Sequence, residues 1–182
     1  SGPATPFEDR LLRVFAREGL SLTLSQLGEM AHEIQDYSNR ILVLDPEAIQ
    51  TLKAMRQFGP VGLVSNYDHP PNVHLLIERD GLGDSFDVVI ISGEIGIWKP
   101  DPGILLAALE PMGITDPACV VYVGDSAVDV EAARAAKMPS VLIRREGGPS
   151  DPLREQQEEI SIEADMVISR LSQLVEILPD LP

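Results

Sequence analysis

Residues 119–129 read CVVYVGDSAVD, and this stretch decides the fold because an apolar run, a tight polar turn and the start of a helix follow one another directly. The apolar half has the β-branched and aromatic content of a buried strand, and the Gly-Asp-Ser turn leads into a helical pattern over 127–136. A strand joined to a helix in this way is half of a βαβ unit. The segment therefore predicts a parallel sheet covered by helices.

The same alternation recurs on both sides of this stretch. The predicted strands are 61–65, 87–91, 119–123, 140–143 and 165–168, and the predicted helices are about 46–57, 70–80, 102–112, 127–136 and 169–178. The charged, proline-rich segment 146–162 is expected to be a solvated loop. This order predicts an α/β fold with a doubly wound, mostly parallel, Rossmann-like sheet.

Residues 7–44 follow a different pattern. One amphipathic helix is predicted from Phe7 to Glu18, and a second begins near Thr23 or Ser25 and continues to about Asn39. Together they predict a small helical hairpin. The sequence thus divides into a helical part, residues 1–44, and an α/β core, residues 45–182.

Charge excludes several classes of partner. The 182 residues contain 14 Lys and Arg against 29 Asp and Glu, a formal net charge of -15 that repels nucleic acid and anionic membranes. No apolar stretch reaches the roughly 20 residues that span a bilayer, and the opening residues have no export signal. With a single cysteine, Cys119, the composition predicts a cytoplasmic protein.

Polar residues follow two of the predicted strands in an unusual way. Ser65 and Asn66 end strand 61–65, where a hydroxyl and backbone N–H groups can hold an anion, although the pair also suits an ordinary turn. Lys99 follows strand 87–91 and is fixed by the prolines after it, so that its ammonium can neutralise a phosphoryl group; a plain surface lysine is the alternative. Because ligands collect at the carboxyl ends of parallel strands, these residues are candidate site residues.

The third strand end carries two carboxylates. Asp125 follows strand 119–123 and Asp129 lies one helical turn later, so both can face one point. Mg²⁺ is typically held by one or two protein carboxylates together with water and substrate oxygens. The pair therefore predicts a Mg²⁺ site, with a helix N-cap as the alternative.

Taken together, these three strand ends resemble the haloacid dehalogenase superfamily. Ser65-Asn66 is similar to its second motif, Lys99-Pro100-Asp101-Pro102 to its third, and Gly124-Asp125-Ser126 with Asp129 to its fourth. The resemblance covers about residues 46–145. Residues 7–44 look like the helical cap of the phosphoglycolate phosphatase-like branch.

The resemblance implies a phosphohydrolase that acts on a small phosphorylated metabolite through an aspartyl-phosphate intermediate. Ser65 and Asn66 would bind the phosphoryl group, Lys99 would hold nucleophile and phosphate together, and Asp125 with Asp129 would hold Mg²⁺. A metal-free 2-haloacid dehalogenase is a weaker alternative, because dehalogenases of this superfamily do not carry the Gly-Asp-x-x-x-Asp pattern. The resemblance does not fix the oligomeric state, and a homodimer is an open alternative.

One element of the resemblance is missing. The first motif, an apolar strand that ends in Asp-x-Asp and supplies the nucleophile, does not occur in these 182 residues. The strand can come from a segment outside the sequence, or residues 41–45 can replace it, with Asp45 as a substitute nucleophile and Glu47 two residues later. Alternatively, the chain is a nucleophile-less binding protein, or a strand is exchanged between protomers.

Overall fold

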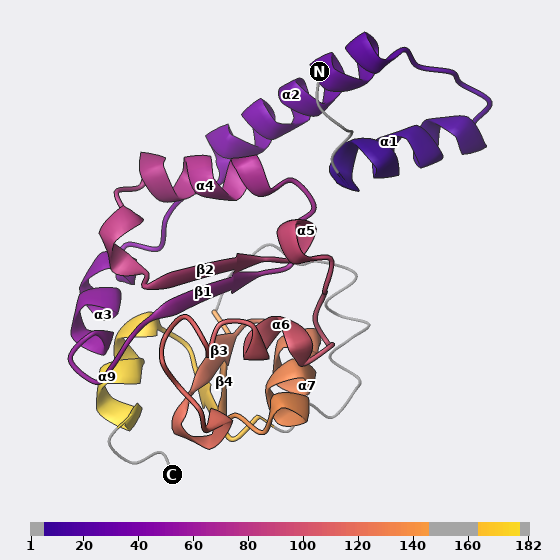
Figure 1. Cartoon of the computed structure of the whole chain (residues 1–182). Coiled ribbons are helices and arrows are strands. Elements are labelled where there is room, and N and C mark those ends of the chain that lie inside the picture. The colour runs from indigo at the N-terminus through magenta and orange to yellow at the C-terminus, as the bar shows by residue number, and fades with distance from the viewer. Residues whose placement is uncertain (1–5, 146–163, 179–182) are drawn as a thin grey trace.

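The computed structural model describes residues 6–145 and 164–178, so the predicted loop at 146–162 lies outside the described residues (Figure 1). The α-helices are α1 (Pro6–Arg17), α2 (Leu24–Ile41), α3 (Ala48–Met55), α4 (Pro70–Arg79), α5 (Ser92–Ile95), α6 (Gly103–Leu106), α7 (Ala127–Ala136) and α9 (Leu174–Ile177). The strands are β1 (Gly62–Ser65), β2 (Val88–Ile91), β3 (Tyr122–Gly124), β4 (Ser140–Ile143) and β5 (Met166–Ile168), and the 3₁₀ helices are η1 (Gly83–Ser85), η2 (Pro117–Cys119) and η3 (Leu171–Gln173). The alternation confirms the predicted α/β fold.

In the part of the chain that the structure describes, the strands form two separate parallel sheets. β1 pairs with β2 from Gly62 opposite Val88 to Ser65 opposite Ile91. β4 lies between β3 and β5 and pairs in parallel with both, and all four of its residues are buried. Within the described residues, no ladder joins β1 to β3.

Helices cover both faces of the β3–β4–β5 sheet. Alternate side chains around β3 point to opposite faces: Val120 and Tyr122 pack against a cluster from α6 and α7, whereas Val121 and Val123 pack against a cluster of β4, β5 and α9. Figure 1 shows α7 and α9 on opposite sides of this sheet. The first cluster also receives Val64 of β1, so the two sheets share one helical layer.

Helices α1 and α2 form a hairpin that projects from the layered body (Figure 1). Phe7 of α1 and Leu27 and Ala31 of α2 are buried. Thr23 begins α2 with a capping box, in which its hydroxyl accepts from Gln26 N and the Gln26 side chain accepts from Thr23 N. Arg79 of α4 donates to the carbonyl oxygens near the end of α2 and so ties the hairpin to the core.

Residues 41–45, one of the alternatives for the missing first-motif strand, form no strand. Ile41 is the last residue of α2, and Leu42 N donates to Ser38 O, so Leu42 caps the helix instead of joining a sheet. Residues 42–45 pair with no strand, and the side chain of Val43 is 87% exposed. The apolar and β-branched residues of this segment favour a strand, but a strand without a neighbour gains no ladder hydrogen bonds. The segment therefore caps α2 instead.

Other elements also begin or end differently from their predictions, most clearly α6, β3 and the predicted last helix 169–178, of which residues 171–173 form η3 and only Leu174–Ile177 is α-helical. α6 ends at Leu106, and the bonds from Ala108 N to Leu105 O and from Leu109 N to Leu106 O are of the tighter i→i−3 type before Pro111. β3 begins at Tyr122 instead of residue 119, because residues 117–119 form η2, capped by the side chain of Asp116.

Among residues 6–145 and 164–178, no helix is both long enough and apolar enough to cross a membrane.

Candidate active site

The loop between α5 and α6 is fastened to the end of β1. Asn66 follows the last residue of β1, and its Oδ1 accepts from Lys99 N at 2.9 Å while its Nδ2 donates to Lys99 O at 3.1 Å. A side-chain amide that bonds to both the N–H and the C=O of one residue fixes the two peptide groups on either side of that residue's Cα. Two predicted site residues, 33 positions apart in the sequence, are thus brought together.

The ammonium of Lys99 is enclosed by polar partners. Its Nζ donates to Asp129 Oδ1 at 2.7 Å and to the hydroxyl of Tyr122 at 3.0 Å, and its side chain is only 10% exposed. It also lies 5.7 Å from the centroid of the Tyr122 ring, within the range of a cation–π contact. An ammonium has three N–H donors, and these two hydrogen bonds fix its direction.

Asp129 is the buried anion of this group and is 4% exposed. Its Oδ1 accepts from Lys99 and Tyr122, and its Oδ2 accepts from the N–H of Asp125, the N–H of Ser126 and the hydroxyl of Ser126. Burial alone would raise the pKa of this carboxyl, but the hydrogen bonds and charge of Lys99, with those from Ser126 and the Asp125 amide, lower it below its usual value. Asp129 is therefore an ionised side chain that holds Lys99 and caps α7.

Tyr122 is a site residue that the sequence patterns do not single out. Its hydroxyl donates to Asp129 Oδ1 at 3.1 Å and accepts from Lys99, so it touches both members of the ion pair. Burial first, and the negative charge of Asp129 second, raise its pKa and keep the phenol protonated. The sequence did carry a signal for it: Tyr122 stands in a predicted strand of otherwise apolar residues. A buried phenol requires a hydrogen-bond partner, so such a tyrosine indicates a polar group nearby.

Gly124 makes this approach of strand and helix possible. A Cβ at position 124 would lie 2.3 Å from the Cβ of Asp129, far inside van der Waals contact. Only glycine lets the end of β3 pass this close to the first turn of α7. The glycine therefore sets the position of the Asp129 carboxylate.

Asp125 and Ser65 lie at strand ends, but on different sheets. Asp125 is exposed directly after β3, and Ser65 is half-buried at the end of β1, opposite Ile91. The described residues contain no group of three or more His, Cys, Asp or Glu side chains suited to a metal. Asp125, exposed at the strand tip, fits a cation that takes one or two protein carboxylates. Both oxygens of Asp129 accept hydrogen bonds from the chain.

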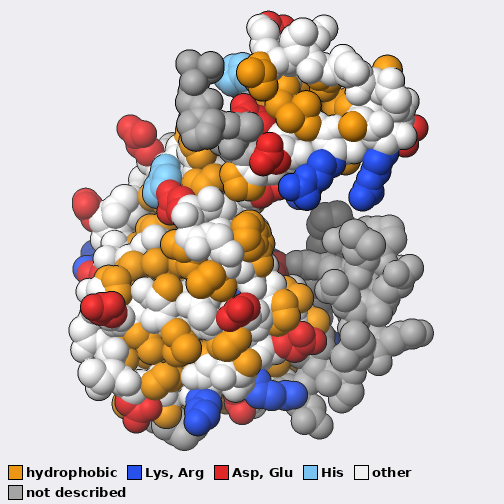
Figure 2. Space-filling view, turned by 45° about the vertical axis from the view of Figure 1, so that its right-hand side comes forward, with side chains coloured by type: hydrophobic (Ala, Val, Ile, Leu, Met, Phe, Trp, Pro, Cys, Tyr) orange, Lys and Arg blue, Asp and Glu red, His pale blue; other side chains and the backbone are white. Residues whose placement is uncertain are grey.

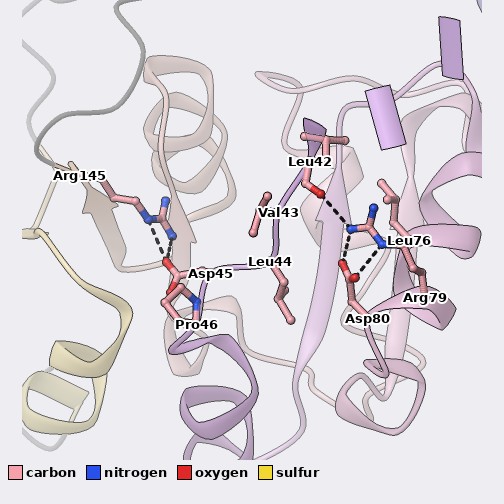
Figure 3. Close-up of a pocket in the computed structure, with 9 residues that line it drawn as sticks. All are labelled: Leu42, Val43, Leu44, Asp45, Pro46, Leu76, Arg79, Asp80 and Arg145. Atoms are coloured by element: carbon pink, nitrogen blue, oxygen red, sulfur yellow. Dashed lines mark hydrogen bonds and ion pairs between the residues drawn. The ribbon is translucent and has the colours of Figure 1, made fainter. Parts of the chain in front are cut away.

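Asp45 lies elsewhere, beside an open pocket of about 610 Å³ (Figure 3). Its Oδ2 accepts from Arg145 Nε at 3.0 Å and Nη2 at 2.7 Å, and its Oδ1 accepts from Glu47 N. Burial raises the pKa of Asp45, but these hydrogen bonds and the Arg145 charge outweigh it and lower the pKa. The contacts join Asp45 to the end of β4, and its role as a substitute nucleophile stays a prediction.

The hairpin contacts the loop that follows the site residues of β1. Arg10 forms an ion pair of 3.0 Å with Asp68, and Phe7 N donates to Asp68 O. The Tyr67 hydroxyl donates to Gln35 Oε1 of α2 at 3.0 Å. The loop after Ser65 therefore connects the hairpin with the Lys99 group.

Comparison with known proteins matches residues 8–137 to the haloacid dehalogenase-like hydrolases. Phosphoglycolate phosphatase of Escherichia coli K12 is 41% identical over 99 residues, which are 54% of this chain and 38% of that enzyme. The pyrimidine 5'-nucleotidase YjjG of the same organism is 40% identical over 83 residues, which are 45% of this chain and 36% of the nucleotidase. The matched regions thus span less than half of either enzyme.

Solved structures are similar over nearly the whole chain. The HAD phosphatase from Thermococcus onnurineus has a TM-score of 0.65 and 31% identity, over 90% of this chain and 68% of its own. The L-2-haloacid dehalogenase from Xanthobacter autotrophicus has a TM-score of 0.72 over 96% of this chain and 75% of its own. At 24% identity, the second similarity shows a shared fold only.

Proposed function

This chain belongs to the haloacid dehalogenase-like hydrolases, and we propose that it acts within that family as a Mg²⁺-dependent phosphohydrolase on a small phosphoester. The observation that carries the proposal is the Lys99 ammonium, which is buried, aimed by Asp129 and Tyr122, and fixed at its backbone by Asn66. A preorganised cation of this kind stabilises charge that develops on a phosphoryl group. The phosphatases among its relatives support the same chemistry.

Each residue of the group has a separate role in this proposal. The hydroxyl of Ser65 and the backbone N–H of Asn66 bind the phosphoryl group at the end of β1, and Lys99 neutralises it while holding the attacking carboxylate beside it. Asp129 and Tyr122 keep the ammonium oriented and contribute no chemical step themselves. The buried position of Lys99 strengthens its interaction with an anion, because little water competes for it.

Asp125 is the residue best suited to bind Mg²⁺. It is exposed at the tip of β3, next to the first turn of α7, and Mg²⁺ takes such a carboxylate together with water and substrate oxygens. When bound, the ion offsets the negative charge of the nucleophile and the phosphate. We assign Asp129 an indirect role, because Lys99, Tyr122 and the turn before α7 already occupy its oxygens.

The nucleophile in this proposal is an aspartate on a strand that lies outside residues 1–182 and pairs between β1 and β3. Neither strand has a ladder partner on that side within the described residues. A parallel strand placed there would end beside Ser65, Lys99 and Asp125, where its carboxylate could attack phosphorus and form the aspartyl-phosphate that water then hydrolyses. Residues 1–44 would be the cap and residues 45–182 the core of a cytoplasmic enzyme.

The test measures hydrolysis of p-nitrophenyl phosphate with and without Mg²⁺. We expect the 182-residue chain to hydrolyse this substrate at or near the background rate, and a longer version with an Asp-x-Asp strand to hydrolyse it only when Mg²⁺ is present.

In the longer version, Lys99→Ala should lower kcat by on the order of 10²-fold or more. A kcat within threefold of the wild type, accompanied by a higher KM, would show that Lys99 only binds the ground state.

The same assay tests Asp45. Strong Mg²⁺-dependent turnover by the 182-residue chain that Asp45→Asn abolishes would establish Asp45 as the nucleophile and overturn our assignment. If neither the wild-type 182-residue chain nor its Asp45→Asn variant hydrolyses the substrate and the variant is less stable, Asp45 serves the ion pair with Arg145 and is not the nucleophile.

A second candidate function is a nucleophile-less binding protein. The observation that favours it is that the carboxylate of Asp45, the substitute nucleophile considered above, is bound by Arg145. This candidate predicts that the longest natural form binds inorganic phosphate without hydrolysing any phosphoester. Halide release from a 2-haloacid in the presence of EDTA would instead indicate a dehalogenase.

A further inference from the structure

Ser92 is a buried serine that has no role in the proposed function so far. It follows β2 directly, and its exposed fraction is 0%. Its Oγ accepts from Tyr67 N at 2.9 Å and donates to Tyr67 O at 3.2 Å. One hydroxyl thus holds both backbone groups of a residue that lies 25 positions earlier in the chain. Hydrogen bonds are strong at such a buried position, so these two keep the backbone of Tyr67 in one orientation.

Gly93 brings the chain after β2 close enough for these bonds. Its N–H donates to Tyr67 O at 3.0 Å, which adds a second hydrogen bond to the same carbonyl oxygen. A Cβ at position 93 would lie 2.8 Å from Tyr67 O and 3.0 Å from Cγ of Pro70, at the start of α4. A side chain does not fit into this space, so the approach requires glycine. We call Ser92 and Gly93 together the Tyr67 clamp.

The Tyr67 clamp begins where the ladder between β1 and β2 ends. Ser65, opposite Ile91, is the last residue of that ladder. Asn66 therefore lies between a residue fixed by the ladder and a residue fixed by the clamp. Its side chain is also bound to the backbone of Lys99. Because the chain is held on both sides of Asn66, the backbone N–H of Asn66 has a fixed direction.

The fixed segment lies where the helical hairpin meets the body of the molecule. The N–H of Phe7 in α1 donates to the carbonyl oxygen of Asp68, one residue after Tyr67. Figure 2 shows the surface hollowed between the upper lobe, which is this hairpin, and the body below it. Asn66 is exposed, whereas Ser92 is buried. The clamp therefore holds this segment from its buried side and does not contact a ligand.

We infer that Ser92 is a positioning residue for the phosphoryl group of the substrate. Through the backbone of Tyr67, it holds the Asn66 N–H, beside the Ser65 hydroxyl, in the direction in which it binds the anion. Donors that are aimed before the ligand arrives bind it more tightly, because less ordering has to accompany binding. This inference rests on the proposed function, in which these two donors receive the phosphoryl group.

The experiment measures the affinity for inorganic phosphate by calorimetric titration with Mg²⁺ present, in the longer version that carries an Asp-x-Asp strand. Ser92→Ala removes one oxygen atom and keeps the hydrogen bond from Gly93 N to Tyr67 O. We expect phosphate to bind the variant about tenfold more weakly than the wild type, which is the effect of about one net hydrogen bond. Amide hydrogen exchange at Tyr67 should become faster, because its N–H loses its acceptor.

Gly93→Ala disturbs the Tyr67 clamp in a different way. The added Cβ pushes against Tyr67 O, while the hydroxyl of Ser92 is still present. We expect the affinity for phosphate to fall here as well. Two variants that disturb the same contact differently separate the effect of the contact from any other effect of either residue.

The matched control is Ser140→Ala. Ser140 is also a buried serine, and its hydroxyl likewise both donates and accepts, to Asp165 Oδ2 and from Asp165 N. It begins β4, whereas the proposed site lies at strand ends. We expect Ser140→Ala to lose stability in denaturant unfolding by an amount comparable to Ser92→Ala, but to keep the wild-type affinity for phosphate.

Two results would overturn the inference while leaving the proposed function intact. One is an affinity for phosphate that is unchanged in Ser92→Ala or in Gly93→Ala, and the other is an equal loss of affinity in Ser92→Ala and Ser140→Ala. If the wild type itself binds no phosphate, the proposed binding of the phosphoryl group at the end of β1 fails, and the role of Ser92 fails with it.

Discussion

The Lys99 group depends on a tyrosine hydroxyl, and this dependence can be measured. Tyr122→Phe removes one donor to Asp129 and one acceptor for Lys99 but keeps the aromatic ring against the α6–α7 cluster. We expect unfolding to become easier by about 1 kcal/mol and the affinity for inorganic phosphate, measured by calorimetry, to fall several-fold.

The control for this substitution is Tyr67→Phe. It also removes a phenol with two hydrogen-bond partners, Gln35 and Asn72, but neither partner touches Lys99. We expect a similar loss of stability and no change in phosphate affinity. Equal losses of affinity in the two variants would show that Tyr122 contributes only to folding.

Gly124 offers a prediction about backbone approach. Gly124→Ala places a Cβ against Asp129 and must push α7 away from β3, which should destabilise the fold by about 1–3 kcal/mol in denaturant unfolding. Gly28→Ala, in the interior of α2 with open space around its Cβ position, should instead stabilise it by about 0.5–1 kcal/mol. If both substitutions stabilise the chain, the close packing of strand and helix at Gly124 is wrong.

Residue patterns predicted the strand ends but not the contacts between them. The polar residues after strands 61–65, 87–91 and 119–123 were recognisable because each of them ends a run of apolar strand residues. The pair Lys99–Asp129 joins residues 30 positions apart, so no local spacing predicts it, and the role of Asp129 at a Mg²⁺ site stays a prediction. Tyr122 was missed for a related reason, since a tyrosine in an apolar strand has the same local pattern whether or not its hydroxyl has a function.

At the scale of elements, the local patterns gave helix α7 its bounds and strand β4 its bounds, because capping and burial are local signals there. The local patterns did not predict the structure of segments whose conformation depends on contacts with distant residues. Residues 41–45 have strand composition, yet Leu42 caps α2 and Arg79 takes up its carbonyl oxygen. The sequence does not show which neighbour an exposed apolar segment will have.

The start of the β4–β5 ladder supplies a prediction about pH. Asp165 Oδ2 accepts from both the N–H and the hydroxyl of Ser140 at 2.7 Å, and these bonds lower the pKa of Asp165. A depressed pKa in the folded state stabilises the fold above the unfolded-state pKa, near 4, and this contribution is lost as the pH falls through the folded-state pKa.

Asp165→Asn isolates the charge, because asparagine keeps an oxygen in the same place. We expect the variant to be less stable at pH 7 by at most about 1 kcal/mol, since the carboxylate is exposed and water weakens the contact. Below pH 4 the difference between wild type and variant should shrink toward zero. Chemical unfolding at a series of pH values checks this, and a difference that grows in acid would contradict the assignment.

At the scale of the whole molecule, the two sheets are joined through helices and not through a ladder. The α6–α7 cluster receives Val64 and Ile90 from the β1–β2 sheet and Val120 and Tyr122 from the other side. The second cluster, which includes Leu174, receives residues of β3, β4 and β5 and Met55 of α3, but none of β1 or β2. Whether the shared helical layer makes the chain one cooperative unit can be tested by a substitution in the second cluster.

Leu174→Ala removes a side chain that is 5% exposed and should lower the free energy of unfolding by about 2–5 kcal/mol. If the α6–α7 cluster couples the sheets, amide hydrogen exchange in β1 and β2 should accelerate by the same factor as in β4, although Leu174 does not pack against β1 or β2. Exchange that accelerates in β4 and β5 but stays unchanged in β1 and β2 would show two independent units. The site would then lie between parts that open separately, because Asn66 follows β1 whereas Asp129 follows β3, and Lys99 is bound to both.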